Sequence, residues 1–345
     1  MERKRITYFD HLRVTATLAV ILIHVAAQNW YAQDVSTFEW QTFNFYDSIS
    51  RWAVPIFVMI SGALMLEKEM SIRTLYMKKI PRLLIAFSFW STIYAIIEGG
   101  GTEKILINII NGKYHLWFIY LIIGLYICIP IIKKIAEDKR ISEYYLAVSL
   151  VFTFLIPFVL MLIADLCGNA AEVWVKSIEA VCDDMNISLA NGYVTYYILG
   201  FYLNNIEISK VKRNVIYFLG VLGTVATIIL CSFFSVEKGN AVTNYYEYVN
   251  INILAQSVAV FVFFKYDAPA MKRQGLLMGK LAKYSFGIYV VHILILEGLQ
   301  KRIGLNTLSF NPILSVPIIS VIVLLISCTI SALINRIPIL KDYIT

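Results

Sequence analysis

Charged residues are scarce in this sequence. Of its 345 residues only 15% are Asp, Glu, Lys or Arg, whereas 59% are hydrophobic, and the mean hydropathy is +0.70. Soluble globular domains carry about 25% charged residues. This composition excludes the ordinary soluble classes and indicates a protein with many membrane-spanning segments.

The sequence also lacks the short motifs of several protein classes. It contains no P-loop, no dinucleotide-binding glycine fingerprint, no zinc-ligand spacing and no G-x-S-x-G turn. These absences argue against electron carriers and nucleotide-driven pumps, and no metal is expected. The five cysteines do not form a disulfide scaffold. Cys167 and Cys182 fall in one external loop and could pair.

The chain has instead a series of apolar stretches. Windows of about 20 apolar residues predict spanning helices. We therefore expect an all-α fold, a polytopic membrane protein with about ten transmembrane helices around a central polar cavity, in a single domain over residues 1–345. The predicted spans are residues 6–27, 46–66, 82–98, 114–135, 144–166, 191–206, 214–235, 248–265, 284–303 and 312–334.

Basic residues are distributed unevenly between the loops. Of the 30 Lys and Arg residues, 22 fall on the side of the N-terminus, and Arg13 and Arg51 fall inside spans. Cytoplasmic loops carry an excess of Lys and Arg, so both termini are predicted to be cytoplasmic and the protein to lie in the cell membrane. The placement of these residues explains the net charge of +7 without nucleic acid, and membrane lipids are the expected partners. The six residues on the opposite side are Lys104, Lys113, Lys176, Lys238, Lys301 and Arg302.

The first apolar run, residues 6–27, contains several ionisable side chains. Arg13 and His24 are eleven residues apart, which places them on nearly the same helix face, about 16 Å apart along the axis. Ionisable groups at membrane depth usually mark function. Arg13 with Asp10 is either an ion pair that locks helices or an anion site for a phosphate-bearing donor. His24 is either a packing residue or a general base. A signal peptide is an alternative interpretation of this run, but Asp10 and Arg13 precede the apolar core.

The second and fourth spans hold two more polar residues. Arg51 precedes Pro55 by four residues, and because proline lacks an N–H the helix is predicted to be kinked there. Arg51 either lines a cavity or lies among lipid headgroups, and Gly62 predicts a close helix contact. His115, in the segment YHLWFIY, either belongs to an interfacial aromatic belt or is a second polar group beside His24.

The ninth span carries a polar face. Spacings of four and three residues place Ser285, Tyr289 and His292 on one side of a helix, where they either line a cavity or pack in isolation. A basic cluster after the second span either sets topology through anionic lipid or guides an anionic donor, and it consists of Lys78, Lys79 and Arg82.

These motifs together resemble the acyltransferase 3 family of integral membrane acyltransferases. The resemblance rests on Asp-x-x-Arg-x10-His in the first span, PIFVMISG in the second, HLWF in the fourth and YSFGIYVVH in the ninth. It covers nearly the whole chain, with the motifs in the family's order. Because no soluble domain is seen after the spans, the chain resembles the stand-alone members.

The resemblance implies an enzyme that moves an acyl group, commonly acetyl, from cytosolic acyl-CoA to a hydroxyl of an extracytoplasmic acceptor. Family acceptors are mostly surface glycans, including lipid-linked sugars. The family's motif arginine and histidine fall on Arg13 and His24, and its basic stretch is matched loosely by Lys78, Lys79 and Arg82. We expect His24 to act as general base, with Tyr289, His292 or Arg51 near the oxyanion.

A transporter of a polar small molecule or lipid-linked glycan is the alternative hypothesis. Ten spans with internal charges suit it equally well on physical grounds. Transporters commonly contain paired repeats with broken helices, and no repeat is seen in this sequence. No serine or cysteine is placed convincingly beside His24, so the sequence favours direct acyl transfer, while an acyl-His24 intermediate stays open.

Overall fold

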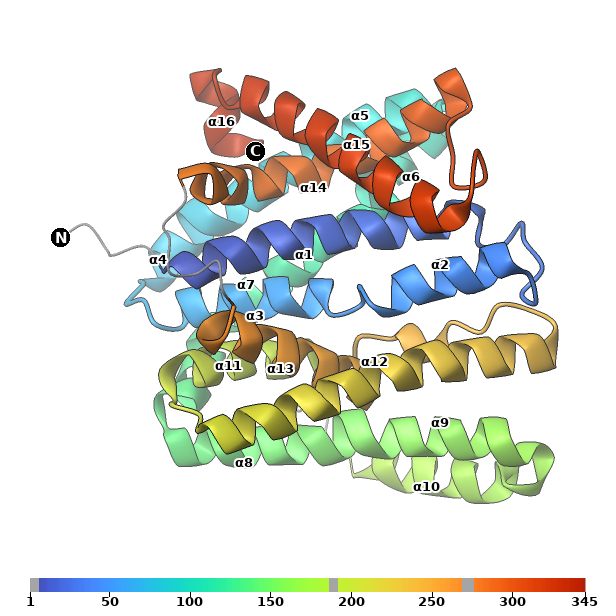
Figure 1. Cartoon of the computed structure of the whole chain (residues 1–345). Coiled ribbons are helices and arrows are strands. Elements are labelled where there is room, and N and C mark those ends of the chain that lie inside the picture. Colours follow the sequence, from blue (N-terminus) through green and yellow to red (C-terminus); the bar gives the residue numbers. More distant parts are fainter. Residues whose placement is uncertain (1–5, 186–191, 269–275, 345) are drawn as a thin grey trace. The chain divides into compact units, whose positions relative to one another are not determined.

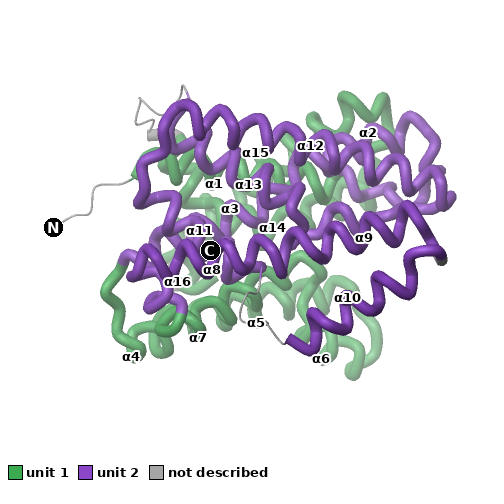
Figure 2. Tube along the Cα trace, turned by 90° about the horizontal axis from the view of Figure 1, so that it is seen from below, with its two compact units in different colours: residues 1–25, 68–131, 273–345 green, residues 26–67, 132–272 purple. Residues whose placement is uncertain are grey.

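The structure of the chain is a computed structural model that describes residues 6–185, 192–268 and 276–344. Every regular element in these ranges is helical, and no strand occurs among them, which confirms the all-α prediction. The chain forms two compact units, each built from segments distant in sequence (Figure 2). Unit 1 holds residues 1–25, 68–131 and 273–345, and unit 2 holds residues 26–67 and 132–272.

Unit 1 combines the first helix of the chain with the last three (Figure 1). Within it α14 packs against α15, and α5 packs against α6 and α16. The start of α1 and helix α16 lie at the same end of this unit in Figure 1. The elements are α1 Thr7–Ala26, α4 Ile72–Thr74, the π-turn η2 Leu75–Lys79, α5 Ile80–Glu98, α6 Thr102–Asn111, the 3-10 turn η3 Tyr114–Leu116, α7 Trp117–Glu137, α14 Leu276–Ile303, α15 Pro312–Ile334 and α16 Pro338–Tyr343.

Unit 2 contains the helices of the middle of the chain. Helix α12 packs along α13, α3 packs along α11, and α10 folds back against α9. The elements are η1 Ala27–Asn29, α2 Phe38–Ser48, α3 Ala53–Met65, α8 Lys139–Ser149, the π-turn η4 Leu150–Leu155, α9 Ile156–Cys167, η5 Gly168–Ala170, α10 Glu172–Asp184, α11 Gly192–Asn205, α12 Lys210–Lys238, η6 Asn244–Tyr246 and α13 Ile251–Tyr266.

Prolines interrupt several helices. The helix of the second span breaks between Ser48 and Ala53, close to the kink predicted from Pro55, so that it becomes α2 and α3. The two π-turns each end just before a helix that has proline in its first turn, namely Pro81 in α5 and Pro157 in α9. Since proline cannot donate to the preceding turn, the backbone widens where a regular bond is missing.

Two glycines allow α3 and α11 to approach closely. An ideal Cβ on Gly62 would lie 1.9 Å from the carbonyl oxygen of Tyr197, and one on Gly200 would lie 2.1 Å from that of Met59. Only residues without a side chain fit at these two positions, as is common where membrane helices touch. The contact predicted at Gly62 is therefore confirmed.

The apolar length of the helices confirms a multi-pass membrane protein. Among the described residues, nine helical stretches are long and apolar enough to cross a membrane. The sixth predicted span, residues 191–206, is not among them, because α11 has 14 residues. At 1.5 Å per residue it measures about 21 Å, less than the roughly 30 Å hydrocarbon core. The nine are Thr7–Asn29, Phe38–Met65, Ile72–Glu98, Thr102–Glu137, Lys139–Cys167, Lys210–Lys238, Asn244–Tyr266, Met278–Ile303 and Pro312–Ile334.

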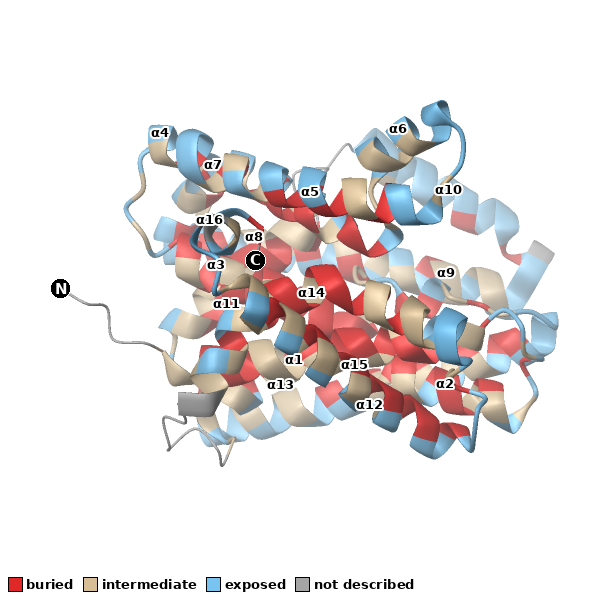
Figure 3. Cartoon of the chain, turned by 90° about the horizontal axis from the view of Figure 1, so that it is seen from above, coloured by how far each residue is buried: buried red, intermediate tan, exposed pale blue. Residues whose placement is uncertain are grey.

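Burial divides the helices of each unit into inner and outer elements. Most of the middle of α14 is buried, whereas α12 exposes large apolar side chains such as Phe218 and Phe233 (Figure 3). Large exposed apolar surfaces are expected on the lipid-facing side of a membrane protein, where they need no cover from the protein.

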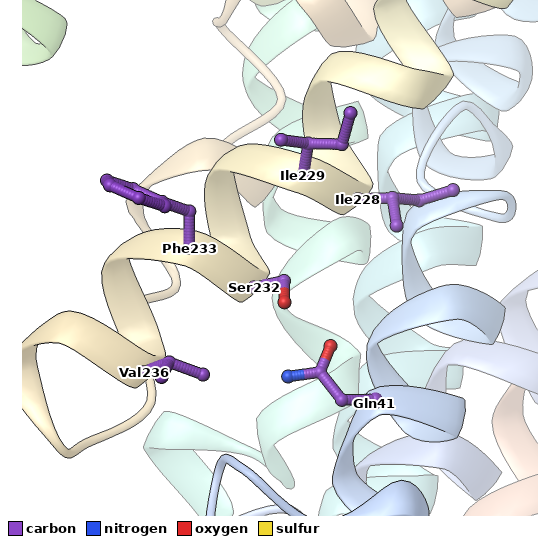
Figure 4. Close-up of a pocket in the computed structure, with 6 residues that line it drawn as sticks. All are labelled: Gln41, Ile228, Ile229, Ser232, Phe233 and Val236. Atoms are coloured by element: carbon purple, nitrogen blue, oxygen red, sulfur yellow. The ribbon is translucent and has the colours of Figure 1, made fainter.

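A pocket of about 450 Å³ opens between α2 and α12 in unit 2 (Figure 4). Figure 4 shows Gln41 facing Ser232, and the other lining residues are Ile228, Ile229, Phe233 and Val236. None of the predicted site residues lines this pocket, so it is not the polar cavity expected from the sequence.

Candidate active site

The candidate site is a cluster of three histidines in unit 1, His24, His115 and His292. The ring centroid of His292 lies 5.1 Å from that of His24 and 5.2 Å from that of His115, and those of His24 and His115 are 6.5 Å apart. The chain has only four histidines. Three of them therefore come together from segments far apart in sequence, and we call this group the histidine cluster.

His24 enters the cluster from the last turn of α1 and is half-buried. Its ring packs edge-on against Tyr114, with 5.5 Å between the ring centroids. Tyr114 is 56% exposed, so the histidine cluster reaches the surface of unit 1 beside this phenol. Below His24 on the same helix, the hydroxyl of Thr17 donates to the carbonyl of Arg13 at 2.7 Å.

His115 is held by the turn η3 between α6 and α7. Gly112 ends α6 with φ of +72°, a conformation that favours glycine, and it packs under Phe87 and Ser91. The hydroxyl of Tyr289 then donates to the carbonyl of His115 at 2.5 Å and ties η3 to α14. His115 is buried beside the Val290 carbonyl, but neither ring nitrogen has a hydrogen bond of ordinary geometry among the described residues.

His292 lies on α14, three residues after Tyr289, and is 1% exposed. Its Nδ1 is 2.6 Å from the carbonyl oxygen of Tyr289. A carbonyl can only accept, so we assign the proton of the neutral ring to Nδ1 and the lone pair to Nε2. Nε2 has no hydrogen-bond partner in the described part of the chain. A buried nitrogen base with an unfilled lone pair calls for an explanation, such as a substrate or water.

An ion network adjoins the histidine cluster. Lys113, two residues before His115, lies 2.6 Å from a carboxylate oxygen of Glu98 and 2.7 Å from one of Glu297. Glu297 also pairs with Lys301 at 2.8 Å. These residues come from the predicted external ends of three spans, so the network joins α5, η3 and α14 at that end of unit 1.

The family is decided by a comparison of the whole sequence. A family model for an acyltransferase domain, acyltransferase 3, matches residues 6–332. The chain belongs to the acyltransferase 3 family. It is therefore a membrane acyltransferase. Neither the curated proteins nor the solved structures contain a match to it.

The other predicted site residues of α1 lie toward the opposite end of that helix. Asp10 is buried and Arg13 is half-buried, and both interact with other residues of the structure. Eleven residues of helix separate Arg13 from His24, a rise of about 16 Å. The arginine and histidine predicted to belong to the family motif thus lie on one helix, about three turns apart.

Ser285 is buried on α14, two turns before His292, and its hydroxyl donates weakly to the carbonyl of Leu281 at 3.5 Å. The basic cluster of the acyltransferase occupies the π-turn η2 and the start of α5. Lys78 and Arg82 are exposed there and Lys79 is half-buried. Their position relative to a donor stays a prediction.

Arg51 belongs to unit 2 and has a different environment. It forms a salt bridge of 2.6 Å with Asp47, one helical turn earlier, and its guanidinium lies over the ring of Tyr246 at 4.4 Å. Asn44 accepts hydrogen bonds from the hydroxyls of Tyr246 and Ser48 beside this pair. We call Arg51, Asp47, Tyr246, Asn44 and Ser48 the Arg51 cluster. Within it the guanidinium of Arg51 contacts a carboxylate and the face of an aromatic ring.

The structure also shows residues that the sequence did not single out. Tyr94 on α5 packs its ring against His115 with 5.2 Å between the centroids, and it lies in an apolar run without a distinguishing pattern. Tyr114 was visible only as part of an aromatic segment next to His115. Cys167 and Cys182 are both free. Among the described residues no three His, Cys, Asp or Glu side chains are arranged to hold a metal ion.

Proposed function

We propose that this acyltransferase moves an acyl group, in the first instance acetyl, from cytosolic acyl-CoA to a hydroxyl of a cell-surface glycan or a lipid-linked sugar. The observation that carries the proposal is the histidine cluster at the predicted external end of unit 1. Imidazole is the side chain best suited to move a proton near neutral pH. A glycan acceptor at the outer face of the cell membrane would reach this end.

His24 is the proposed general base. The acceptor oxygen bonds to the thioester carbonyl carbon while His24 takes the hydroxyl proton. The tetrahedral intermediate then breaks its carbon–sulfur bond, and the proton on His24 passes to the departing CoA sulfur. The half-buried position of His24 beside exposed Tyr114 supports this role, because the base must meet an acceptor that arrives from outside.

The geometry refines the expected roles of two neighbours. The single hydroxyl hydrogen of Tyr289 is already donated to the His115 carbonyl, so Tyr289 is better suited to hold η3 than to stabilise an oxyanion. Neutral His292 offers a lone pair at Nε2, so it can accept a hydrogen bond from the acceptor but cannot donate one to an oxyanion. We assign it to orienting the acceptor hydroxyl.

The donor is proposed to bind toward the cytoplasmic end of α1. CoA carries several phosphates, and a guanidinium pairs with phosphate in a two-pronged fork. Arg13, with Asp10 one turn earlier on the same helix, would hold the charged head. The exposed Lys78 and Arg82 and the half-buried Lys79 would attract it electrostatically. The rise of about 16 Å from Arg13 to His24 would then be spanned by the thin arm of the donor.

The test is release of CoA thiol by the purified full-length protein in detergent. Acetyl-CoA is added with a surface-polysaccharide extract, and the wild-type protein is compared with His24→Ala and with His11→Gln, which removes a buried histidine of α1 outside the cluster. We expect release by the wild type and by His11→Gln, and none above background by His24→Ala. Equal release by His24→Ala would reject its role, and a transporter would release no thiol. Mass spectrometry of surface polysaccharides from cells with and without the protein would then identify the acceptor.

A further inference from the structure

One tyrosine side chain bonds to the backbone of the helix that carries His292. The hydroxyl of Tyr94 donates to the carbonyl of Val290 at 2.9 Å and accepts from the N–H of Leu294 at 3.2 Å. These two backbone groups are four residues apart, the spacing at which they bond to one another in a regular α-helix. A single hydroxyl thus bridges the two ends of one helical turn of α14.

His292 lies in the middle of this bridged turn. A hydroxyl bonded to both ends of this turn restrains the backbone that carries the imidazole, and α14 stays a continuous helix through it. The hydrogen bond that sets the tautomer of His292 uses the carbonyl of Tyr289, one residue before the turn begins. The orientation of the imidazole therefore depends on the conformation that Tyr94 imposes on residues 290–294.

Tyr94 also contacts a second member of the histidine cluster. Its ring packs edge-on against His115 at 5.2 Å between centroids, and the side chain is 3% exposed. One buried residue of α5 therefore touches the ring of His115 through its own ring and the turn of His292 through its hydroxyl.

We propose that Tyr94 is a positioning residue for the acyltransferase reaction. Its hydroxyl holds residues 290–294 in the conformation that keeps the Nδ1 proton of His292 on the Tyr289 carbonyl and leaves Nε2 for the acceptor hydroxyl. Tyr94 itself touches no reacting atom. The catalytic part of this inference rests on the proposed function, whereas the effect on the His292 ring does not.

The hydroxyl is the part that matters. Phenylalanine would fill the same space and keep the contact with His115. Without the hydroxyl, the Val290 carbonyl and the Leu294 N–H can bond to each other as in an ordinary helix, so neither buried group is left unsatisfied. Tyr94→Phe should therefore fold, while residues 290–294 lose the hydroxyl that ties them to α5 and the ring of His292 is held less firmly.

The first experiment observes His292 directly. The full chain is labelled with ¹⁵N-histidine in detergent micelles, where its four histidines give four sets of ring signals. His292→Gln assigns one set. We expect wild-type His292 to show the Nδ1–H tautomer and Tyr94→Phe to show a mixture of both tautomers. The matched control is Tyr196→Phe in unit 2, which removes another buried hydroxyl that donates to a carbonyl, that of Tyr248 at 2.7 Å, and should leave the signals unchanged.

The second experiment measures CoA release by the same variants. A displacement of about 1 Å at a catalytic group can cost roughly a hundredfold in rate. We expect kcat to fall by about ten- to a hundredfold in Tyr94→Phe with an unchanged KM for acetyl-CoA, and to stay at the wild-type level in Tyr196→Phe.

The outcomes separate the two hypotheses. If His292 keeps the wild-type tautomer in Tyr94→Phe, Tyr94 does not position His292, whatever the activity. If the tautomer changes but kcat stays at the wild-type level, Tyr94 positions His292 without an effect on catalysis. If the wild-type protein releases no CoA, the proposed function fails, and the ring signals still decide whether Tyr94 holds His292.

Discussion

Both units bury polar side chains within apolar spans, but they do so in different ways. In unit 2 the positive charge of Arg51 meets the negative charge of Asp47 at 2.6 Å, with side-chain exposures of 18% and 3%. In unit 1 the histidine cluster brings together three imidazoles that carry no fixed charge, and Nε2 of His292 has no partner among the described residues. The charge of Arg51 is therefore neutralised by its neighbour Asp47, whereas in the histidine cluster the lone pair on Nε2 of His292 can still accept a hydrogen bond.

This difference distinguishes buried polar residues that stabilise the fold from those that can take part in a reaction. A buried charge is very costly unless it is paired, so unit 2 is stable only when Arg51 and Asp47 form their ion pair. One atom on each partner, Arg51 Nε and Asp47 Oδ1, is still without a hydrogen bond in the described residues, but the charges cancel. A neutral imidazole is less costly to bury than a charge, and its free nitrogen can still accept a hydrogen bond or a proton. We therefore expect substitutions in the histidine cluster to act on activity and those in the Arg51 cluster to act on stability.

Among variants that keep His24, the largest effect is expected from His292→Gln. Glutamine is polar and close in size, but it does not place an acceptor atom where Nε2 of the imidazole lies. Misplacing a reacting group by about 1 Å can cost roughly a hundredfold in rate. We expect kcat for CoA release to fall by about 10²-fold, because His292 orients the hydroxyl while His24 remains. The unfolding temperature should stay near that of the wild type, and a drop in both would place His292 with the structural residues.

Arg51→Met should produce the reverse pattern. Removing one partner of a buried ion pair leaves an uncompensated charge and costs about 3–5 kcal/mol. We expect the free energy of unfolding, measured by adding SDS to the protein in mild detergent, to fall by that amount, and activity per folded molecule to be retained. The double variant Arg51→Met with Asp47→Leu should recover most of the loss. Full stability with lost activity would instead place Arg51 in the site, as one interpretation of the sequence had it.

Much of the histidine cluster could be predicted from sequence because it depends on helix periodicity. The spacing of Tyr289 and His292 placed both on one face of α14, and both contact His115 of η3, Tyr289 through its hydroxyl and His292 through its ring. His115 was weighed as a neighbour of His24, and their ring centroids are 6.5 Å apart. These inferences needed only the angle per residue and the expectation that buried polar groups find partners.

The missing parts depend on contacts that no local pattern records. The bond from Tyr94 to the backbone of α14 joins residues about 200 positions apart, and nothing in the surrounding apolar run distinguishes this tyrosine. For Arg51 a signal was present, because Asp47 precedes it by four residues, the spacing of an ion pair on a helix. Pro55 indicates a kink in the backbone, but it carries no information about the partner of the Arg51 side chain. The sixth predicted span is short in the sequence, and the structure adds the close contact through Gly62 and Gly200 that packs the short helix α11 against α3.

The helix contact in unit 2 offers a smaller and cleaner test of stability. Gly62→Ala would place a methyl group 1.9 Å from the Tyr197 carbonyl oxygen, so α3 and α11 must separate. Overpacking of this kind costs about 1–3 kcal/mol. The matched control is Gly124→Ala on α7, where nothing lies within 4 Å of the added atom, and which should be neutral or slightly stabilising because alanine favours a helix. Equal effects in the two variants, measured by SDS unfolding, would show that α3 and α11 are not in close contact.

The smallest effect is expected from Lys113→Gln, which opens the ion network beside the histidine cluster. The side chain of Lys113 is 13% exposed and contacts two carboxylates, but those of Glu98 and Glu297 are 33% and 27% exposed and therefore partly solvated. Ion pairs near the surface contribute roughly 0–1 kcal/mol and weaken with salt. We expect a loss of stability in this range that disappears at high ionic strength, together with a modest rise in the KM for the acceptor because η3 is held less firmly. Lys301→Gln removes a more exposed partner of the same Glu297 and should change neither quantity. If both variants behave alike, the ion network contributes nothing to the site beyond solvated charges at the surface. The site would then end at Tyr114 and His115.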